Sequence, residues 1–102
     1  MTTTVRDNSD EHRFEIHVDD ALAGFADYQL HEGRITFTHT EVDDAYEGQG
    51  LGTQLADAAL DSARDAGQQV LPECSFIADH IRRHPDRYLV LVPEGARGTY
   101  DL

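Results

Sequence analysis

The chain has 102 residues, of which 20 are acidic and eight are basic, so it carries a net charge of −12 at pH 7. With 39% hydrophobic residues it has the composition of one small folded domain, which excludes an intrinsically disordered chain. So acidic a domain is expected to bind neither nucleic acid nor anionic membranes, because its charge repels their phosphates.

The absence of targeting features predicts a protein of the reducing cytoplasm. The first residues, "MTTTVRDNSDEH", have neither the basic nor the apolar part of a signal peptide. No apolar run approaches the ~20 residues that a membrane span requires. The single cysteine, Cys74, cannot form an internal disulfide. We expect no metal site.

The N-terminal half predicts an antiparallel meander of three strands. Residues 1–11 are polar and aperiodic, which predicts a flexible segment in front of a domain over residues 12–102. Apolar and polar residues then alternate in "HRFEIHV", "ALAGFADYQLH" and "RITFTHTEV", which is typical of strands with one buried face. A three-residue loop over 19–21 is expected between the first two strands, and it would pair Val18 with Leu22.

The turn between the second and third predicted strands sets their register. Two residues, Glu32 and Gly33, fit a tight hairpin turn, since glycine accepts the positive φ that such turns require. The opposed residues would then be Leu30 and Ile35, Tyr28 and Phe37, Ala26 and His39, and Gly24 and Glu41. The apolar pairs match on one face, which supports this register.

The C-terminal half predicts two amphipathic helices and two strands. In "LGTQLADAALDSARDAG", Leu51 and Leu55 recur at helical spacing, while Asp57 falls on the side that faces water. "QQVLP" predicts a strand, "SFIADHIRRHP" a helix with Phe76 inward, and "YLVLV" a last strand. The predicted order is βββαβαβ, an α+β fold with a mostly antiparallel mixed sheet and two helices.

The stretch "AYEGQGLGTQL" places Gly48, Gly50 and Gly52 between a strand and a helix. Unpaired N–H groups and the positive end of the helix dipole attract anions at such a turn, and glycines let a phosphate approach the main chain. The P-loop motif is excluded because it needs a lysine, and this chain has none. The dinucleotide fingerprint fails at Thr53, where it needs Gly or Ala. The alternative is an ordinary strand-to-helix turn.

The sequence around this loop resembles the GNAT superfamily of N-acetyltransferases. The acyl-coenzyme A signature of that superfamily, Arg/Gln-x-x-Gly-x-Gly/Ala, is matched in "EGQGLG" at Gly50 and Gly52, with Glu47 in place of the usual Arg or Gln. The succession of "HTEV", "GQGLG", "PEC" and "RHP" is similar to that of a group of very small GNAT-like proteins. The resemblance covers most of residues 12–92 and implies a minimal GNAT fold.

This resemblance implies an acetyl-CoA-dependent N-acetyltransferase with a defined cofactor site. Backbone amides of the loop would hold the pyrophosphate of acetyl-CoA, namely those of Gln49, Gly50, Leu51, Gly52 and Thr53. The pantetheine arm would lie where the strand ending at Val42 separates from the strand ending at Pro72. The Val42 amide would then sit close to the thioester carbonyl.

Three residues are candidates for the transfer itself. Cys74 precedes the second helix, whose dipole would stabilise a thiolate, so it could receive the acetyl group. The alternative is that a lone cysteine is a small buried hydrophobe. His39 could accept a proton from an incoming amine, but its place on the apolar face of its strand favours a core histidine. Glu41 shares that face and could be the base or hold the sheet edge.

The acceptor and the activity class stay open at this point. The chain has no room for the additional elements that wall the acceptor pocket of larger GNAT members. The acceptor side should therefore be open to a protein tail or to a partner subunit, a homodimer included. The acid excess favours an amine, whether a protein lysine, a polyamine or a small amine. The alternatives to an enzyme are a coenzyme A-binding module without catalysis and a small structural domain.

Overall fold

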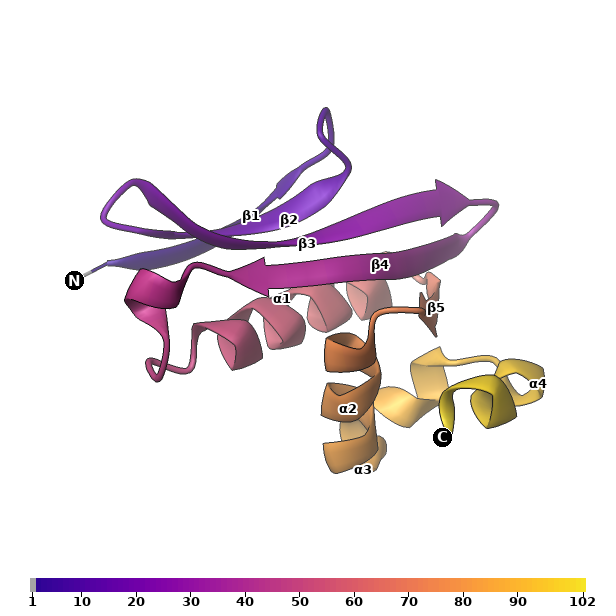
Figure 1. The fold of residues 1–102 in the computed structure, drawn as a ribbon. Helices are drawn as coiled ribbons and strands as arrows, with labels where there is room; N and C mark the ends of the chain where they lie inside the picture. The colour runs from indigo at the N-terminus through magenta and orange to yellow at the C-terminus, as the bar shows by residue number, and fades with distance from the viewer. Residues whose placement is uncertain (1) are drawn as a thin grey trace.

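A five-stranded sheet with helices on one face makes up the computed structural model of this protein, which describes residues 2–102 (Figure 1). The strands lie side by side in sequence order: β1 (Thr3–Asn8), β2 (Arg13–Val18), β3 (Ala21–His31), β4 (Arg34–Val42) and β5 (Gln69–Pro72). Neighbours among β1 to β4 are antiparallel, and β5 is parallel to β4. The predicted α+β class is confirmed.

Two longer helices and several short ones accompany the sheet. The longer helices are α1 (Leu51–Asp65) and α2 (Ser75–Arg83), both in the predicted places. The short segments are η1 (Asp44–Tyr46), α3 (Pro85–Tyr88), η2 (Leu89–Leu91), α4 (Glu94–Arg97) and η3 (Gly98–Tyr100). A helix able to span a bilayer is not found among residues 2–102.

The hydrophobic core lies between the sheet and α1. The helix buries the face that its periodicity predicts, which consists of leucines and alanines: Leu51, Leu55, Ala56, Ala59, Leu60 and Ala63. The sheet contributes Phe14, Ile16 and Phe37, each almost fully buried. Burial of each large apolar side chain contributes roughly 1.5–3 kcal/mol. This packing fixes α1, and therefore the glycine loop that precedes it, against the sheet.

The β3–β4 hairpin has the predicted turn but only half of the predicted register. Glu32 and Gly33 both have positive φ, 44° and 82°, and the pairing confirms Leu30 opposite Ile35 and Tyr28 opposite Phe37. The register then shifts by one residue, so that Ala26 faces Thr40 and Gly24 faces Val42, and the prediction is wrong beyond Phe37. A bulge of this kind reverses which side chains face the core.

The β2–β3 connection is shorter than predicted. Asp19 and Asp20 form a two-residue turn with φ of 49° and 74°, so that Val18 pairs with Ala21 rather than with Leu22. Aspartate is among the residues that tolerate this left-handed conformation, which explains how the turn forms without glycine. The extra residue is absorbed by a bulge instead, and Leu22 is 41% exposed.

The predicted flexible segment over residues 1–11 is corrected by β1. Thr3–Asn8 pair antiparallel with β2, and the side chain of Val5 packs against the core. The Tyr28 hydroxyl donates a hydrogen bond to Asp7 Oδ1 at 2.5 Å. An edge strand with a single apolar contact has too little alternation to be predicted from its sequence. Met1, which belonged to the same prediction, lies outside the described residues.

The predicted last strand over residues 88–92 is wrong, because this segment is helical. Pro85 occupies the first turn of α3, where a missing N–H costs nothing, so it begins a helix as well as following α2. Tyr88 and Val92 are fully buried, whereas Val90 is 77% exposed. A separation of four residues between buried positions fits a helical turn. The order is therefore ββββαβα followed by short helices.

Candidate functional site

The glycine loop ends in a left-handed residue that leaves the start of α1 uncapped. Gly50 is the N-cap with φ 72°, and no side chain caps the helix. Among residues 2–102, no acceptor is found for the N–H groups of Leu51, Gly52 and Thr53, and the first helical bond runs from Gln54 N to Gly50 O at 3.2 Å. Because these N–H groups carry the positive end of the helix dipole, this turn can bind an anion.

Gly52 has a different reason to be glycine. A Cβ at this position would lie 2.7 Å from Cζ of Phe76, so the ring of α2 occupies the space that a side chain would need. Phe76 is therefore not turned inward as predicted. It is 41% exposed and lies against the first turn of α1, beside the uncapped N–H groups.

The strand β4 continues past its partner β5 and leaves an open edge. The parallel pairing covers Arg34 to Phe37 against Gln69 to Pro72, while β4 runs on to Val42 (Figure 1). Beyond Pro72 the chain turns away into α2. The two strands separate at the point where the sequence resemblance places the pantetheine arm, which stays a prediction.

The amides of this open edge point toward the gap. Asp43 N donates to Ala23 O of β3 at 2.7 Å, so Asp43 occupies a hydrogen-bonded position of this antiparallel pair. Such positions alternate with non-hydrogen-bonded ones, so the N–H of Val42, which lies opposite Gly24, is directed away from β3. The same alternation directs the N–H of Thr40 to that side. The gap beside β4 is thus lined by backbone donors, next to the N-termini of α1 and α2.

Cys74 lies at the inner end of this gap. It is the N-cap of α2 and is 8% exposed. Its N–H donates to Phe37 O at 2.8 Å, at the last paired residue of β4. Its Sγ donates a hydrogen bond to Thr40 Oγ1 at 3.3 Å. The thiol is thus buried, as expected of a small hydrophobic cysteine. It also lies at the gap, where a thiol that receives the acetyl group would have to lie.

His39 and Glu41 lie together on the opposite face of β4. Their side chains are 55% and 61% exposed, and His39 Nε2 is 3.0 Å from Glu41 Oε1. His39 is therefore not a core residue, because the bulge after Phe37 turns it outward. The structure pairs His39 with Glu41 but does not bring either of them to Cys74, since the backbone of β4 lies between the two groups.

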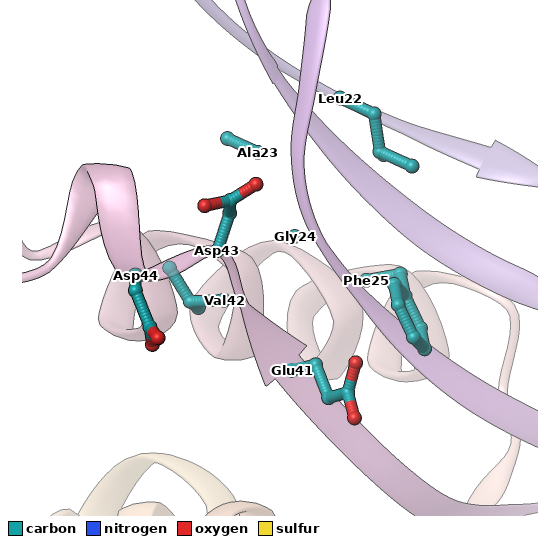
Figure 2. A pocket seen from close by; sticks show the side chains of 8 residues that line it. All are labelled: Leu22, Ala23, Gly24, Phe25, Glu41, Val42, Asp43 and Asp44. Carbon is teal, nitrogen blue, oxygen red and sulfur yellow. The ribbon is translucent and has the colours of Figure 1, made fainter.

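A cavity of about 490 Å³ adjoins this pair at the ends of β3 and β4 (Figure 2). Its lining is part apolar and part acidic: Leu22, Ala23, Gly24, Phe25, Glu41, Val42, Asp43 and Asp44. Added bulk at Gly24 is excluded, since a Cβ there would lie 2.7 Å from Glu41 O. Three carboxylates beside apolar side chains favour a cationic ligand with an aliphatic part.

A second polar cluster, which sequence reasoning missed, joins the helices. Asp57 Oδ1 accepts hydrogen bonds from the Tyr88 hydroxyl at 2.6 Å and from His80 Nε2 at 2.7 Å. Burial raises the pKa of Asp57, but the hydrogen bonds from Tyr88 and His80 outweigh it, so the pKa lies below its usual range. Burial and the neighbouring Asp57 raise the pKa of Tyr88. No sequence signal links residues so far apart, and Asp57 was predicted to face water.

Comparisons with known proteins identify relatives of this chain. The model of the GCN5-related N-acetyl-transferase family matches residues 13–91. Protein NATD1 of Gallus gallus and of Mus musculus is 35% identical over 51 residues, which is 50% of this chain and 46% of those proteins. The match to Protein NATD1 of Homo sapiens has the same identity and covers 45% of that protein. The chain thus spans about half the length of these relatives.

Two solved structures share the fold. The solution structure of a GCN5-like protein from Staphylococcus aureus has a TM-score of 0.64 and 26% identity, and the match covers 88% of this chain and 87% of that one. The crystal structure of Ard1 from Thermoplasma volcanium has a TM-score of 0.53 and 22% identity. That match covers 60% of this chain and 43% of the other, and it shows a likeness of fold alone.

Proposed function

Because the chain belongs to the GCN5-related N-acetyltransferase family, we propose that it transfers an acetyl group from acetyl-CoA to an amine. The observation that carries the proposal is the open edge of β4, whose residues 38–42 extend past β5 beside the uncapped start of α1. In this proposal the gap holds the reacting thioester and the glycine loop holds the far end of the cofactor.

The glycine loop fits the diphosphate of coenzyme A. Added Cβ atoms at Gly48 and Gly50 would meet nothing within 4 Å, so the space over the loop is open. The backbone N–H groups of Gln49, Gly50, Leu51, Gly52 and Thr53 would bind the diphosphate. Because main-chain groups do this, Glu47 in place of the usual Arg or Gln is compatible with binding. When bound, acetyl-CoA supplies an acetyl group activated as a thioester.

Backbone and thiol groups at the gap would carry the first half of the transfer. The Val42 N–H would stabilise negative charge on the carbonyl oxygen. The Cys74 thiolate would attack the carbonyl carbon. The bond to Sγ would form as the bond to the sulfur of coenzyme A breaks, and coenzyme A would leave as a thiolate that takes up the proton released when Cys74 ionised. The product is an acetylated Cys74.

The acceptor would approach from the face that carries His39 and Glu41. The acidic cavity beside Val42 would attract a protonated amine, whether a protein lysine, a polyamine or a small amine, and its carboxylates would orient the chain that bears it. The neutral amine would attack the acetyl carbon of Cys74, its proton would pass through water to the His39–Glu41 pair on the other face of β4, and the sulfur would leave as thiolate. If the amine attacked the thioester directly, the His39–Glu41 pair would serve as the base and Cys74 would not be needed.

The cofactor site is tested by two matched glycine variants. Gly50→Ala and Gly67→Ala each force a Cβ onto a residue with positive φ, 72° and 69°, with open space around it. Both should lose comparable stability, about 1 kcal/mol. Only Gly50→Ala should weaken coenzyme A binding in calorimetry, at least about tenfold. Equal affinity in the two variants would place the site elsewhere, and no heat with the wild-type protein would overturn the proposed function.

The covalent route is tested by mass spectrometry after incubation with acetyl-CoA. The wild-type protein should gain one acetyl group, and Cys74→Ala should gain none. Acetylation of an amine acceptor by Cys74→Ala at the wild-type rate would replace this route with direct transfer. Binding of coenzyme A without transfer to any of a panel of amines would favour the non-catalytic module instead.

A further inference from the structure

Thr40 lies where the thiol of Cys74 meets the open edge of β4. Its Oγ1 is 3.3 Å from Sγ, and the sequence separation of 34 residues makes this a contact between β4 and the start of α2. Thr40 is half-buried and belongs to the stretch of β4 that has no β5 partner. The other two candidate groups, His39 and Glu41, are turned to the opposite face by the bulge.

A hydroxyl suits this position because it can both accept and donate a hydrogen bond. While the sulfur is protonated, Thr40 Oγ1 accepts the S–H. When the proton leaves, rotation about the C–O bond lets the hydroxyl donate to the thiolate, with no movement of heavier atoms. A hydrogen bond to a charged group is roughly twice as strong as one between neutral groups. The same contact therefore holds Sγ in place and favours its reactive form.

Other polar side chains near Cys74 are engaged elsewhere. His80, the next histidine along α2, is bound to Asp57 at 2.7 Å. Glu73, which precedes the cysteine, accepts a hydrogen bond from the Tyr100 hydroxyl at 2.9 Å. Thr40 is thus the side chain that the described structure pairs with the thiol.

We propose that Thr40 is a positioning residue for Cys74, holding the sulfur at the gap and stabilising its thiolate for acetyl transfer. This inference rests on the proposed function in which Cys74 is the nucleophile. Thr40 acts through the sulfur and does not itself exchange bonds with the acetyl group. A purely structural contact would stabilise the fold without changing how fast the sulfur reacts.

The test compares three variants of β4 in the full chain without any cofactor. Thr40→Val removes the hydroxyl and keeps the shape, and Thr40→Ser keeps the hydroxyl. Thr38→Val removes a hydroxyl that contacts Asp27 O instead of the thiol. The measurement is the rate of Cys74 alkylation by iodoacetamide between about pH 6 and about pH 9, a range that spans ordinary thiol ionisation. Thermal unfolding of each variant reports whether its fold is intact.

Thr40→Val should react about fivefold more slowly near neutral pH, because its sulfur loses the donor that stabilises the thiolate. The difference should close toward about pH 9, where the thiol ionises without help. Thr40→Ser and Thr38→Val should stay within about twofold of the wild type. Equal rates for Thr40→Val and the wild type at every pH would overturn the inference. Because no cofactor is present, that result is distinct from a failure to bind coenzyme A.

Discussion

Glu15 is a buried carboxylate on the sheet face that the helices leave open. It is 3% exposed, and it is surrounded by Asn8, Arg13 and His17, which donate hydrogen bonds at 2.8–3.0 Å. The hydrogen bonds from His17, Arg13 and Asn8 outweigh the effect of burial and lower the pKa of Glu15 from 4.5 to about 2. A charge removed from water in this way is stable only because it is fully paired.

This pairing makes Glu15 a source of stability that depends on pH. A lowered folded-state pKa adds stability above the unfolded value, and that stability is lost as the pH falls from 4.5 to about 2. We expect Glu15→Gln to be less stable at pH 7 by at most roughly 3.5 kcal/mol, since each pKa unit is worth ~1.4 kcal/mol. Urea unfolding should show this deficit at neutral pH and its decline below pH 4.5.

The exposed Glu11→Gln serves as the control and should leave stability nearly unchanged. A deficit for Glu15→Gln that persisted at low pH would mean that shape, rather than charge, decides the stability at this position.

The elements α1, α2 and α3 are joined by the hydrogen bonds of Asp57 with His80 and Tyr88. Tyr88→Phe should cost about 2 kcal/mol of unfolding free energy, because a hydrogen bond to a charged group is lost in a buried place. The variant also removes one cause of the low Asp57 pKa. That pKa should therefore rise, and the deficit should shrink in acid as Asp57 becomes protonated in both proteins.

The matched control for Tyr88→Phe is Tyr46→Phe, which removes the hydroxyl of a half-buried tyrosine outside this cluster. Denaturant unfolding of the two variants at pH 7 should give a large loss for the first and a small one for the second. Equal losses would contradict a stabilising role for the Asp57 cluster.

Elements with strong periodicity were predictable, and those shaped by distant contacts were not. The spacing of Leu51 and Leu55 located α1, and the turn at Glu32 and Gly33 fixed half of a hairpin. The bulge after Phe37 leaves no mark in the alternation, so the faces of the last β4 residues were reversed. The segment 88–92 has strand composition, but its helical packing decides its conformation.

The candidate site divides in the same way. The glycine loop and the uncapped helix start follow from local sequence, since a left-handed Gly50 and free N–H groups need only their neighbours. Which groups meet at the gap depends on the register of β4. That register brings Thr40 to Cys74 and sends His39 and Glu41 to the other face, which no local pattern specifies.

At the scale of the whole molecule, β1 completes a sheet that extends beyond the residues matched by the family model. This strand is the first in the sheet and precedes residue 13, where the match to the family model begins. It pairs with the edge of β2 that faces away from β3. Deleting residues 2–8 would remove the packing of Val5 and the hydrogen bond between Asp7 and Tyr28. The melting temperature should fall by at least about 10 °C, since ~1 kcal/mol corresponds to ~4–8 °C in a domain of this size.

The deletion should also change association. Without β1, the backbone of β2 becomes a free edge that can pair with another chain. Size-exclusion chromatography should therefore show dimers or aggregates of the truncated protein. These should elute earlier than the full chain does at the same concentration. An unchanged melting temperature and elution profile would support the flexible segment that the sequence predicted.

The net charge of −12 acts on the whole fold. Like charges crowded on a small surface repel one another, and unfolding relieves this repulsion by moving them apart. Salt shortens the screening length from about 10 Å at 0.1 M to about 3 Å at 1 M, so it should stabilise the native state. It also weakens exposed ion pairs such as Arg64 with Asp61, but such pairs are worth at most about 1 kcal/mol.

We therefore expect the melting temperature at pH 7 to rise by about 5 °C between 0.1 M and 1 M sodium chloride. The internal control is the same titration near pH 4.6, the isoelectric point of the sequence, where the net charge and the rise should both vanish. A fall with salt at pH 7 would mean that ion pairs such as those of Glu15 outweigh the repulsion. A rise of equal size at both pH values would point to an effect of the salt on apolar hydration, which does not depend on charge.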